Sequence, residues 1–183
     1  MSLDIVIEDP RWEALELEAL AEHAFAATLA ALSIEAEEAE ASLLACDDAR
    51  IAVLNADFRD KPTPTNVLSW PAEERGADRP GAAPLPPAPD AFGALELGDM
   101  AIAWETCARE AAEQDKSPHD HVSHLIVHAT LHLLGYDHID AADAALMEGL
   151  EIRILASLGI ADPYAEGDPA PRPGDLERND GQS

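Results

Sequence analysis

Residues 119–138 read HDHVSHLIVHATLHLLGYDH and contain six of the seven histidines of the protein. Just before them, Ser117 and Pro118 form a typical N-cap and first helical position, so we expect a helix to begin there. The apolar residues of the stretch predict that the helix continues to Leu134. Gly135 then follows, and a glycine in this position commonly ends a helix in the left-handed conformation.

The histidines of this helix have the spacing of metal ligands. His128 and His132 are four residues apart, so their side chains project from one face, one turn from each other. Gly135 allows the chain to reverse, which can return His138 to the same point. Three imidazoles with an open fourth position are the catalytic form of zinc ligation, and imidazole suits Zn²⁺ better than Mg²⁺. We therefore predict one Zn²⁺ per chain, held by His128, His132 and His138.

The neighbouring polar residues leave alternatives open. His124 lies one turn before His128 and is the strongest rival ligand. Asp137 either orients a ligating imidazole or faces solvent. His119 and His121 lie in the first turn of the helix, and we expect both to be exposed.

The segments on either side of this helix alternate between strand and helix patterns. This mixture predicts an α/β or α+β domain with one small sheet. The Gly98-Asp99 pair interrupts one strand, and we interpret it as a bulge. The expected strands are residues 3–9, 41–46, 67–70 and 95–104, and the expected further helices are residues 12–32, Asp47 or Asp48 through Phe58, and 141–158.

Proline-rich segments set the limits of the predicted domain. Residues 71–94 lack hydrophobic periodicity and are interpreted as a long loop within it. Residues 161–183 are polar and proline-rich, and we expect a disordered C-terminal tail there. A single domain is therefore expected over residues 1–160.

The charge and the N-terminus exclude several classes of protein. The chain of 183 residues has 37 acidic and 11 basic residues, a net charge of −26, which disfavours DNA and anionic membranes as partners. Its two cysteines do not form a disulfide framework, and the N-terminus does not resemble a signal peptide. No apolar run approaches the ~20 residues that span a bilayer. We expect a cytoplasmic protein.

A second constellation lies in residues 55–71, NADFRDKPTPTNVLSWP. Arg59 and Lys61 are two of the few basic residues, and two prolines stiffen the loop around them. A guanidinium can form two hydrogen bonds to a phosphate and stabilise charge that develops on it. An arginine in a loop is more often a solvated ion-pair partner, so this signal is weak on its own.

The histidine pattern HxxxHxxGxxH overlaps the metzincin protease pattern except at one position. Ala129 stands where those proteases have the glutamate that acts as general base. A zinc peptidase is therefore a minority interpretation.

Together these pieces resemble the YbeY family of bacterial metal-dependent endoribonucleases. The matching segments are FRDKPTPTNVLSWP (58–71), LELGDMAIA (95–103), HLIVHATLHLLGYDH (124–138) and the Met147-Glu148 pair. The resemblance implies zinc on His128, His132 and His138 and a role in activity for Arg59. It also implies a single α/β (α+β) domain, in which about five helices pack a small mixed sheet and the metal site lies at the end of a central helix.

The function implied by the resemblance is zinc-dependent cleavage of single-stranded RNA. The expected role is 3′-end maturation of small-subunit ribosomal RNA and ribosome quality control. Arg59 and Lys61 would bind the substrate, and Arg59 would clamp the scissile phosphate. Whether the 2′-hydroxyl of the RNA or a water molecule attacks is left open.

Two other functions stay open at this point. One is a zinc hydrolase of peptides or amides, and the other is a ribosome-assembly factor without catalysis. The net charge opposes binding of naked RNA. We therefore expect that ribosomal particles or ribosome-associated proteins deliver the substrate.

Overall fold

The computed structural model describes residues 2–34, 38–73, 80–84, 87 and 94–164. Its four strands are β1 (Ser2–Ile7), β2 (Ala39–Cys46), β3 (Val67–Pro71) and β4 (Leu95–Ala103). They form one sheet in the order β1-β2-β4-β3, in which β3 is antiparallel to β4 and the other pairs are parallel. The small mixed sheet is confirmed.

Among the described residues, the helices are the 3₁₀ helix η1 (Pro10–Leu15) and five α-helices, so the expectation of about five helices is also confirmed. The α-helices are α1 (Leu17–Ala31), α2 (Asp48–Arg59), α3 (Trp104–Glu113), α4 (Pro118–Leu133) and α5 (Ala141–Ser157).

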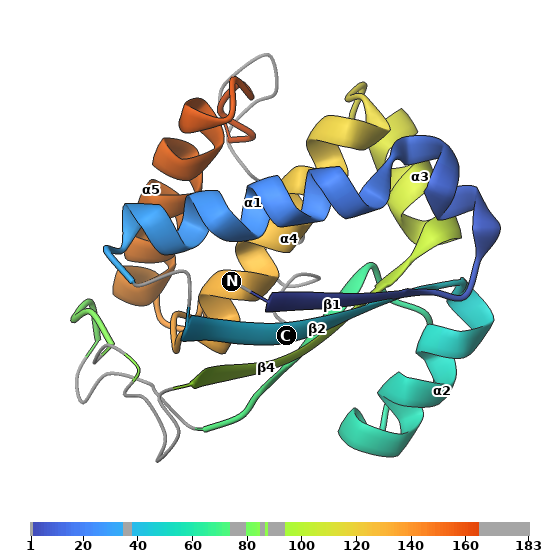
Figure 1. Cartoon of the computed structure of the whole chain (residues 1–183), viewed down its shortest axis with the longest axis horizontal. Helices are drawn as coiled ribbons and strands as arrows, with labels where there is room; N and C mark the ends of the chain where they lie inside the picture. The colour runs from blue at the N-terminus through green and yellow to red at the C-terminus, as the bar shows by residue number, and fades with distance from the viewer. Residues whose placement is uncertain (1, 35–37, 74–79, 85–86, 88–93, 165–183) are drawn as a thin grey trace.

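Helix α4 lies at the centre of the larger helical layer. It packs against α1, α3, α5 and the sheet, and it carries buried residues along most of its length. Figure 1 shows these four helices on one side of the sheet and α2 on the other. The main hydrophobic core lies between the sheet and the larger layer, and a smaller cluster around Ile51 and Leu68 packs α2 against the opposite face.

The capping residues act as expected from the sequence. The side chain of Ser117 accepts a hydrogen bond from the Asp120 amide at 3.1 Å, with Pro118 in the first turn of α4. Asp47, the first of the two candidate caps, accepts from the Arg50 amide at 2.8 Å and begins α2. Local hydrogen bonding thus determines where both helices begin.

Two predicted elements differ from the structure. The helix expected over residues 12–32 is divided at Glu16, whose φ of 53° is left-handed and separates η1 from α1. The strand expected to reach Trp104 ends at Ala103, and the unpredicted helix α3 begins directly after it. The apolar residues of α3 recur at helical spacing, at Trp104, Cys107, Ala108 and Ala111. This pattern was missed because Trp104 directly continues the apolar run of the strand before it.

The interruption at Gly98 is a bulge, as interpreted. Glu40 of β2 faces Glu96, but the next residue, Ala41, faces Gly98, so β4 contains one extra residue. Gly98 has a φ of 137°, and a Cβ built there would lie 2.1 Å from the Trp70 carbonyl oxygen. The close approach of β3 therefore requires glycine at this position.

The two proline-rich segments lie mostly outside the described residues. Of the predicted loop 71–94, residues 74–79, 85–86 and 88–93 are not described, and of the predicted tail 161–183, residues 165–183 are not described. The boundary at residue 160 stays a prediction. None of the helices that the described ranges contain is long and apolar enough to cross a bilayer.

Candidate metal centre

Three imidazoles meet where α4 ends. His128 and His132 are on the last two turns of the helix, and Gly135, with a φ of 102°, turns the chain back so that His138 faces them. The Tyr136 amide donates to the Leu131 carbonyl at 3.1 Å, which closes this turn. One ring nitrogen from each histidine lies within 4.8 Å of the other two.

The residues present fit a metal ion held by imidazoles. The Nε2 atoms of His128 and His132 are 3.1 Å apart, close to the ~3.3 Å separation of two nitrogens that bind one tetrahedral zinc. His128 is buried, whereas His132 and His138 are half-buried, so part of the cluster is exposed to solvent. Burial, together with the neighbouring His128 and His138, lowers the pKa of His132 well below its usual value. The imidazole is therefore neutral at pH 7, as a ligand must be.

Glu151 of α5 completes the polar environment of this cluster. It was not identified as a site residue from the sequence. Its side chain is fully buried, and its Oε2 accepts from Nδ1 of His128 at 2.7 Å. Burial alone would raise the pKa of Glu151, but His128 and His124 outweigh it and hold the pKa well below its usual range. A signal was present, because Glu151 lies on the same side of α5 as the buried Met147, Ile154 and Leu155.

His124, the rival ligand, is turned toward a different partner. Its Nε2 lies 2.7 Å from Oε1 of Glu151 and 3.4 Å from the hydroxyl of Tyr164. The Tyr164 hydroxyl also donates to the same carboxylate oxygen of Glu151. His124 therefore belongs to the network around Glu151 and not to the three converging imidazoles.

Two other expectations about this stretch are resolved. Asp137 accepts a hydrogen bond from the Ile139 amide at 3.3 Å, so its carboxylate caps the turn. His119 is exposed as expected, but His121 is buried, and that expectation was wrong. Its Nε2 lies 2.9 Å from Oε1 of Glu110 on α3, because the first turn of α4 packs against that helix.

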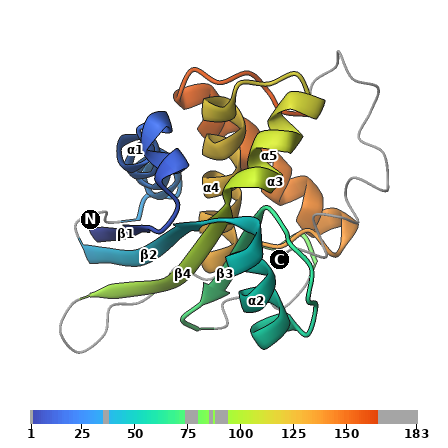
Figure 2. The same ribbon diagram turned by 90° about the vertical axis from the view of Figure 1, so that its right-hand side faces the viewer.

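Arg59 lies at the end of α2, outside the histidine cluster. Its Nη2 donates to the Ser69 carbonyl of β3 at 2.8 Å, and its side chain is half-buried. Burial lowers the pKa of Arg59, although a guanidinium remains charged at neutral pH. Lys61 is exposed in the loop that follows. Figure 2 shows α2 and α4 on opposite sides of the sheet, with β3 beside both.

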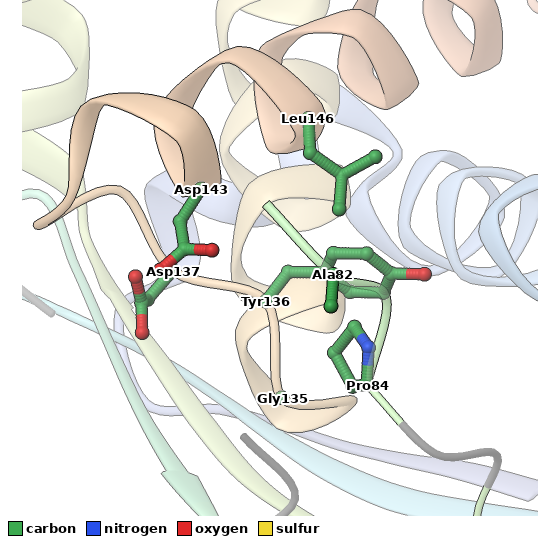
Figure 3. A pocket seen from close by; sticks show the side chains of 7 residues that line it. All are labelled: Ala82, Pro84, Gly135, Tyr136, Asp137, Asp143 and Leu146. Carbon is green, nitrogen blue, oxygen red and sulfur yellow. The ribbon is translucent and has the colours of Figure 1, made fainter. Parts of the chain in front are cut away.

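A small pocket lies beside the turn that carries His138. Figure 3 shows Asp137 and Asp143 on one side of it and Tyr136, Ala82 and Pro84 on the other. The Gly81 amide donates to Asp143 at 2.7 Å, which attaches this part of the proline-rich segment to α5. The described lining does not include the three converging histidines; it consists of Ala82, Pro84, Gly135, Tyr136, Asp137, Asp143 and Leu146.

Comparison with known proteins gives consistent matches over most of the chain. The family model described as Endoribonuclease YbeY matches residues 5–159. A protein of that name from Ruegeria pomeroyi is 61% identical over 164 residues, which cover 90% of this chain and 98% of the relative. Its counterpart in Dinoroseobacter shibae is 61% identical over 163 residues, covering 89% and 90%. The counterpart in Azorhizobium caulinodans is 47% identical over 167 residues, covering 90% and 97%.

A solved structure supports the fold. The solution structure of a Thermotoga maritima protein is similar with a TM-score of 0.52, covering 93% of this chain and 99% of that one. The two sequences are 18% identical, so this similarity concerns the arrangement of strands and helices only.

Proposed function

The chain belongs to the YbeY family of endoribonucleases, and we propose that it cleaves single-stranded ribosomal RNA with one Zn²⁺ held by His128, His132 and His138. Endoribonuclease activity follows from the family, whose role is the maturation of ribosomal RNA. The finer proposal is that the substrate is the 3′ end of the small-subunit RNA. The convergence of the three imidazoles is the observation that carries the zinc-dependent part.

The residues around the cluster support this chemistry. Zinc bound there would act as a Lewis acid toward the scissile phosphodiester. The neutral imidazole of His132 presents a lone pair, and the hydrogen bond to Glu151 fixes the ring of His128. His132 and His138 are half-buried and therefore partly exposed to solvent, where a substrate would approach the cluster.

We propose that Arg59 binds the scissile phosphate. Its hydrogen bond to Ser69 uses one of five N–H donors and anchors the guanidinium to β3. Because α4 packs against β3, the same strand connects that anchor to the helix that carries His128 and His132. Lys61 would add a second positive charge next to the phosphate backbone.

Delivery of the RNA by the ribosome fits the charge of the protein. A net charge of −26 repels naked RNA, so ribosomal particles or ribosome-associated proteins in the cytoplasm would present the strand. Weak binding of naked RNA and a shallow dependence on salt are expected. A steep loss of affinity with rising salt would contradict delivery by a partner.

The experiment that tests the proposal is cleavage of one RNA sequence in single-stranded and duplex form by the zinc-loaded protein. Wild type should cut the single strand, whereas His132→Ala and Arg59→Ala should not. His119→Ala is the matched control, because this exposed histidine is on the same helix and pairs only locally with Asp120. Cutting that survives in His132→Ala would show that the activity belongs to a contaminant.

The other outcomes identify the alternatives. Turnover of peptides or amides that Arg59→Ala spares would indicate a zinc hydrolase of such substrates. Binding to ribosomal particles without cleavage would indicate an assembly factor. Outright unfolding of His132→Ala would favour a structural metal, because metal binding then supplies folding free energy.

A further inference from the structure

We infer that Glu151 is a positioning residue that sets the tautomer of the metal ligand His128, and that Tyr164 and His124 hold Glu151 in place for this task. The inference rests on the proposed zinc site. It goes further in assigning a role to three residues outside the ligand set, one of which comes from the segment after α5.

The argument begins with the hydrogen-bonding capacity of a carboxylate. An ionised carboxylate only accepts, so each ring nitrogen in contact with Glu151 must carry a proton. Nδ1 of His128 lies 2.7 Å from Oε2 of Glu151 and is therefore the protonated nitrogen. In a neutral imidazole this leaves the lone pair on Nε2, which is the atom that faces His132 at 3.1 Å.

The other carboxylate oxygen is occupied as well. Oε1 of Glu151 accepts from Nε2 of His124 at 2.7 Å and from the hydroxyl of Tyr164. A buried carboxylate with an unpaired oxygen would be costly and would rotate toward other donors. The two additional donors therefore keep Oε2 directed at His128.

Tyr164 reaches this position because the chain turns back after α5. The Tyr164 amide donates to the Asp162 carboxylate at 2.7 Å, and Nζ of Lys116 lies 3.5 Å from the Pro163 carbonyl oxygen. Residues 162–164 thus dock against the helical layer and place the phenol next to α5. Residues that follow α5 thus become part of the support for the metal centre.

A matched control is offered by a second carboxylate that contacts a histidine of α4. Glu110 of α3 is partly buried and accepts from Nε2 of His121 at 2.9 Å and from the Asn66 side chain at 2.9 Å. This pair resembles Glu151 and His128 in chemistry, but His121 is not one of the converging imidazoles. Glu110→Gln therefore removes a comparable charge without touching the proposed ligands.

The experiment measures zinc affinity by competition with a chelator and the visible absorption of the Co²⁺-substituted protein. Glu151→Gln should weaken zinc binding about 10- to 100-fold and change the Co²⁺ spectrum, as loss of a ligand's outer partner does. Tyr164→Phe should weaken it roughly fivefold, the effect of one lost hydrogen bond. Glu110→Gln should keep both the affinity and the spectrum of wild type.

Several outcomes would overturn the inference. If Glu151→Gln changes neither the zinc affinity nor the Co²⁺ spectrum, Glu151 has a purely structural role. The same conclusion follows if Glu110→Gln weakens zinc binding as much as Glu151→Gln does. If Glu151→Gln does not fold, Tyr164→Phe decides, because unchanged zinc affinity in that variant would contradict the network. A metal-affinity loss in a protein that cuts no RNA would uphold the positioning role and reject the nuclease, so the two proposals fail separately.

Discussion

Helix α4 carries two buried histidines that each contact a carboxylate from a neighbouring helix, and they differ at the second ring nitrogen. His121 contacts Glu110 through Nε2, and its Nδ1 is buried with no hydrogen-bond partner among the described residues. His128 contacts Glu151 through Nδ1, and its Nε2 faces another imidazole. A buried carboxylate–imidazole pair is therefore not a site by itself. What surrounds the ring nitrogen that does not contact the carboxylate distinguishes the two histidines. Nδ1 of His121 is enclosed in the protein interior, whereas Nε2 of His128 faces a second proposed ligand.

The largest expected effect comes from removing each imidazole in turn. His128→Ala should lower zinc affinity and RNA cleavage by at least about 100-fold, because a ligand contributes no less than its outer partner. His121→Ala should keep zinc binding but lower the free energy of unfolding by about 2 kcal/mol, since it removes one of the two hydrogen-bond donors to the partly buried Glu110 carboxylate. Chelator competition and urea denaturation measure the two quantities.

The reverse pattern would break the comparison. Zinc binding lost in His121→Ala, with the fold intact, would make the N-terminal part of α4 a second functional centre. Zinc binding kept in His128→Ala would remove His128 from the ligands.

A second prediction concerns the support beneath the end of α4 that carries the ligands. Gly98→Ala should lower the free energy of unfolding by about 3 kcal/mol, because the new Cβ meets the Trp70 carbonyl oxygen in a left-handed backbone region. The same Cβ would lie 3.0 Å from Leu133, next to His132, so zinc affinity should fall as well. Thermal denaturation and chelator competition test this.

Gly149→Ala is the control for that substitution. Gly149 is inside α5, and nothing lies within 4 Å of a Cβ built there, so the change should be neutral or stabilise by up to about 1 kcal/mol. Equal losses at both glycines would show that the close approach of β3 is not the cause.

The smallest expected effect is the acid dependence of the pair formed by Glu110 and His121. Burial would raise the pKa of Glu110, but hydrogen bonds from His121 and Asn66 lower it below the usual 4.5. The unfolded chain then binds more protons than the folded one between the two pKa values. The stabilisation is therefore fully present above about pH 4.5 and disappears as the pH falls through the folded pKa.

Glu110→Gln should accordingly be less stable than wild type by about 1 kcal/mol at pH 7, and the difference should shrink toward pH 3. Urea denaturation of the two proteins at a series of pH values measures it. A difference that grows on acidification would mean that the carboxyl is protonated in the folded state.

The sequence was most informative where local rules determine the structure. Ser117, Pro118 and Gly135 define the ends of α4, and the four-residue spacing places His128 above His132 on one face. Helix α3 was not predicted because its apolar face begins at Trp104, which continues the apolar run of β4, and because its N-cap, Ala103, makes no side-chain hydrogen bond. The division of the first helix at Glu16 depends on a backbone conformation that glutamate seldom adopts.

The contacts of the candidate site depended on tertiary structure to a greater extent. Glu151 lies 23 positions after His128, and only the packing of α5 on α4 joins them. Tertiary packing also determines the burial of His121. Its position in the first turn of α4 suggested an exposed side chain, but α3 covers it. Arg59 was identified by its loop and by family resemblance, but its bond to Ser69 requires β3 to be the edge strand of the sheet.

The position of His138 on a turn, and not on α4, has a consequence for folding. His128 and His132 are aligned as soon as the helix forms, whereas His138 is placed only when residues 135–138 have closed onto the helix end. A partly folded chain would thus present two imidazoles, and only the completed domain would present three. Full zinc affinity should therefore appear late in refolding and report that the native turn has formed.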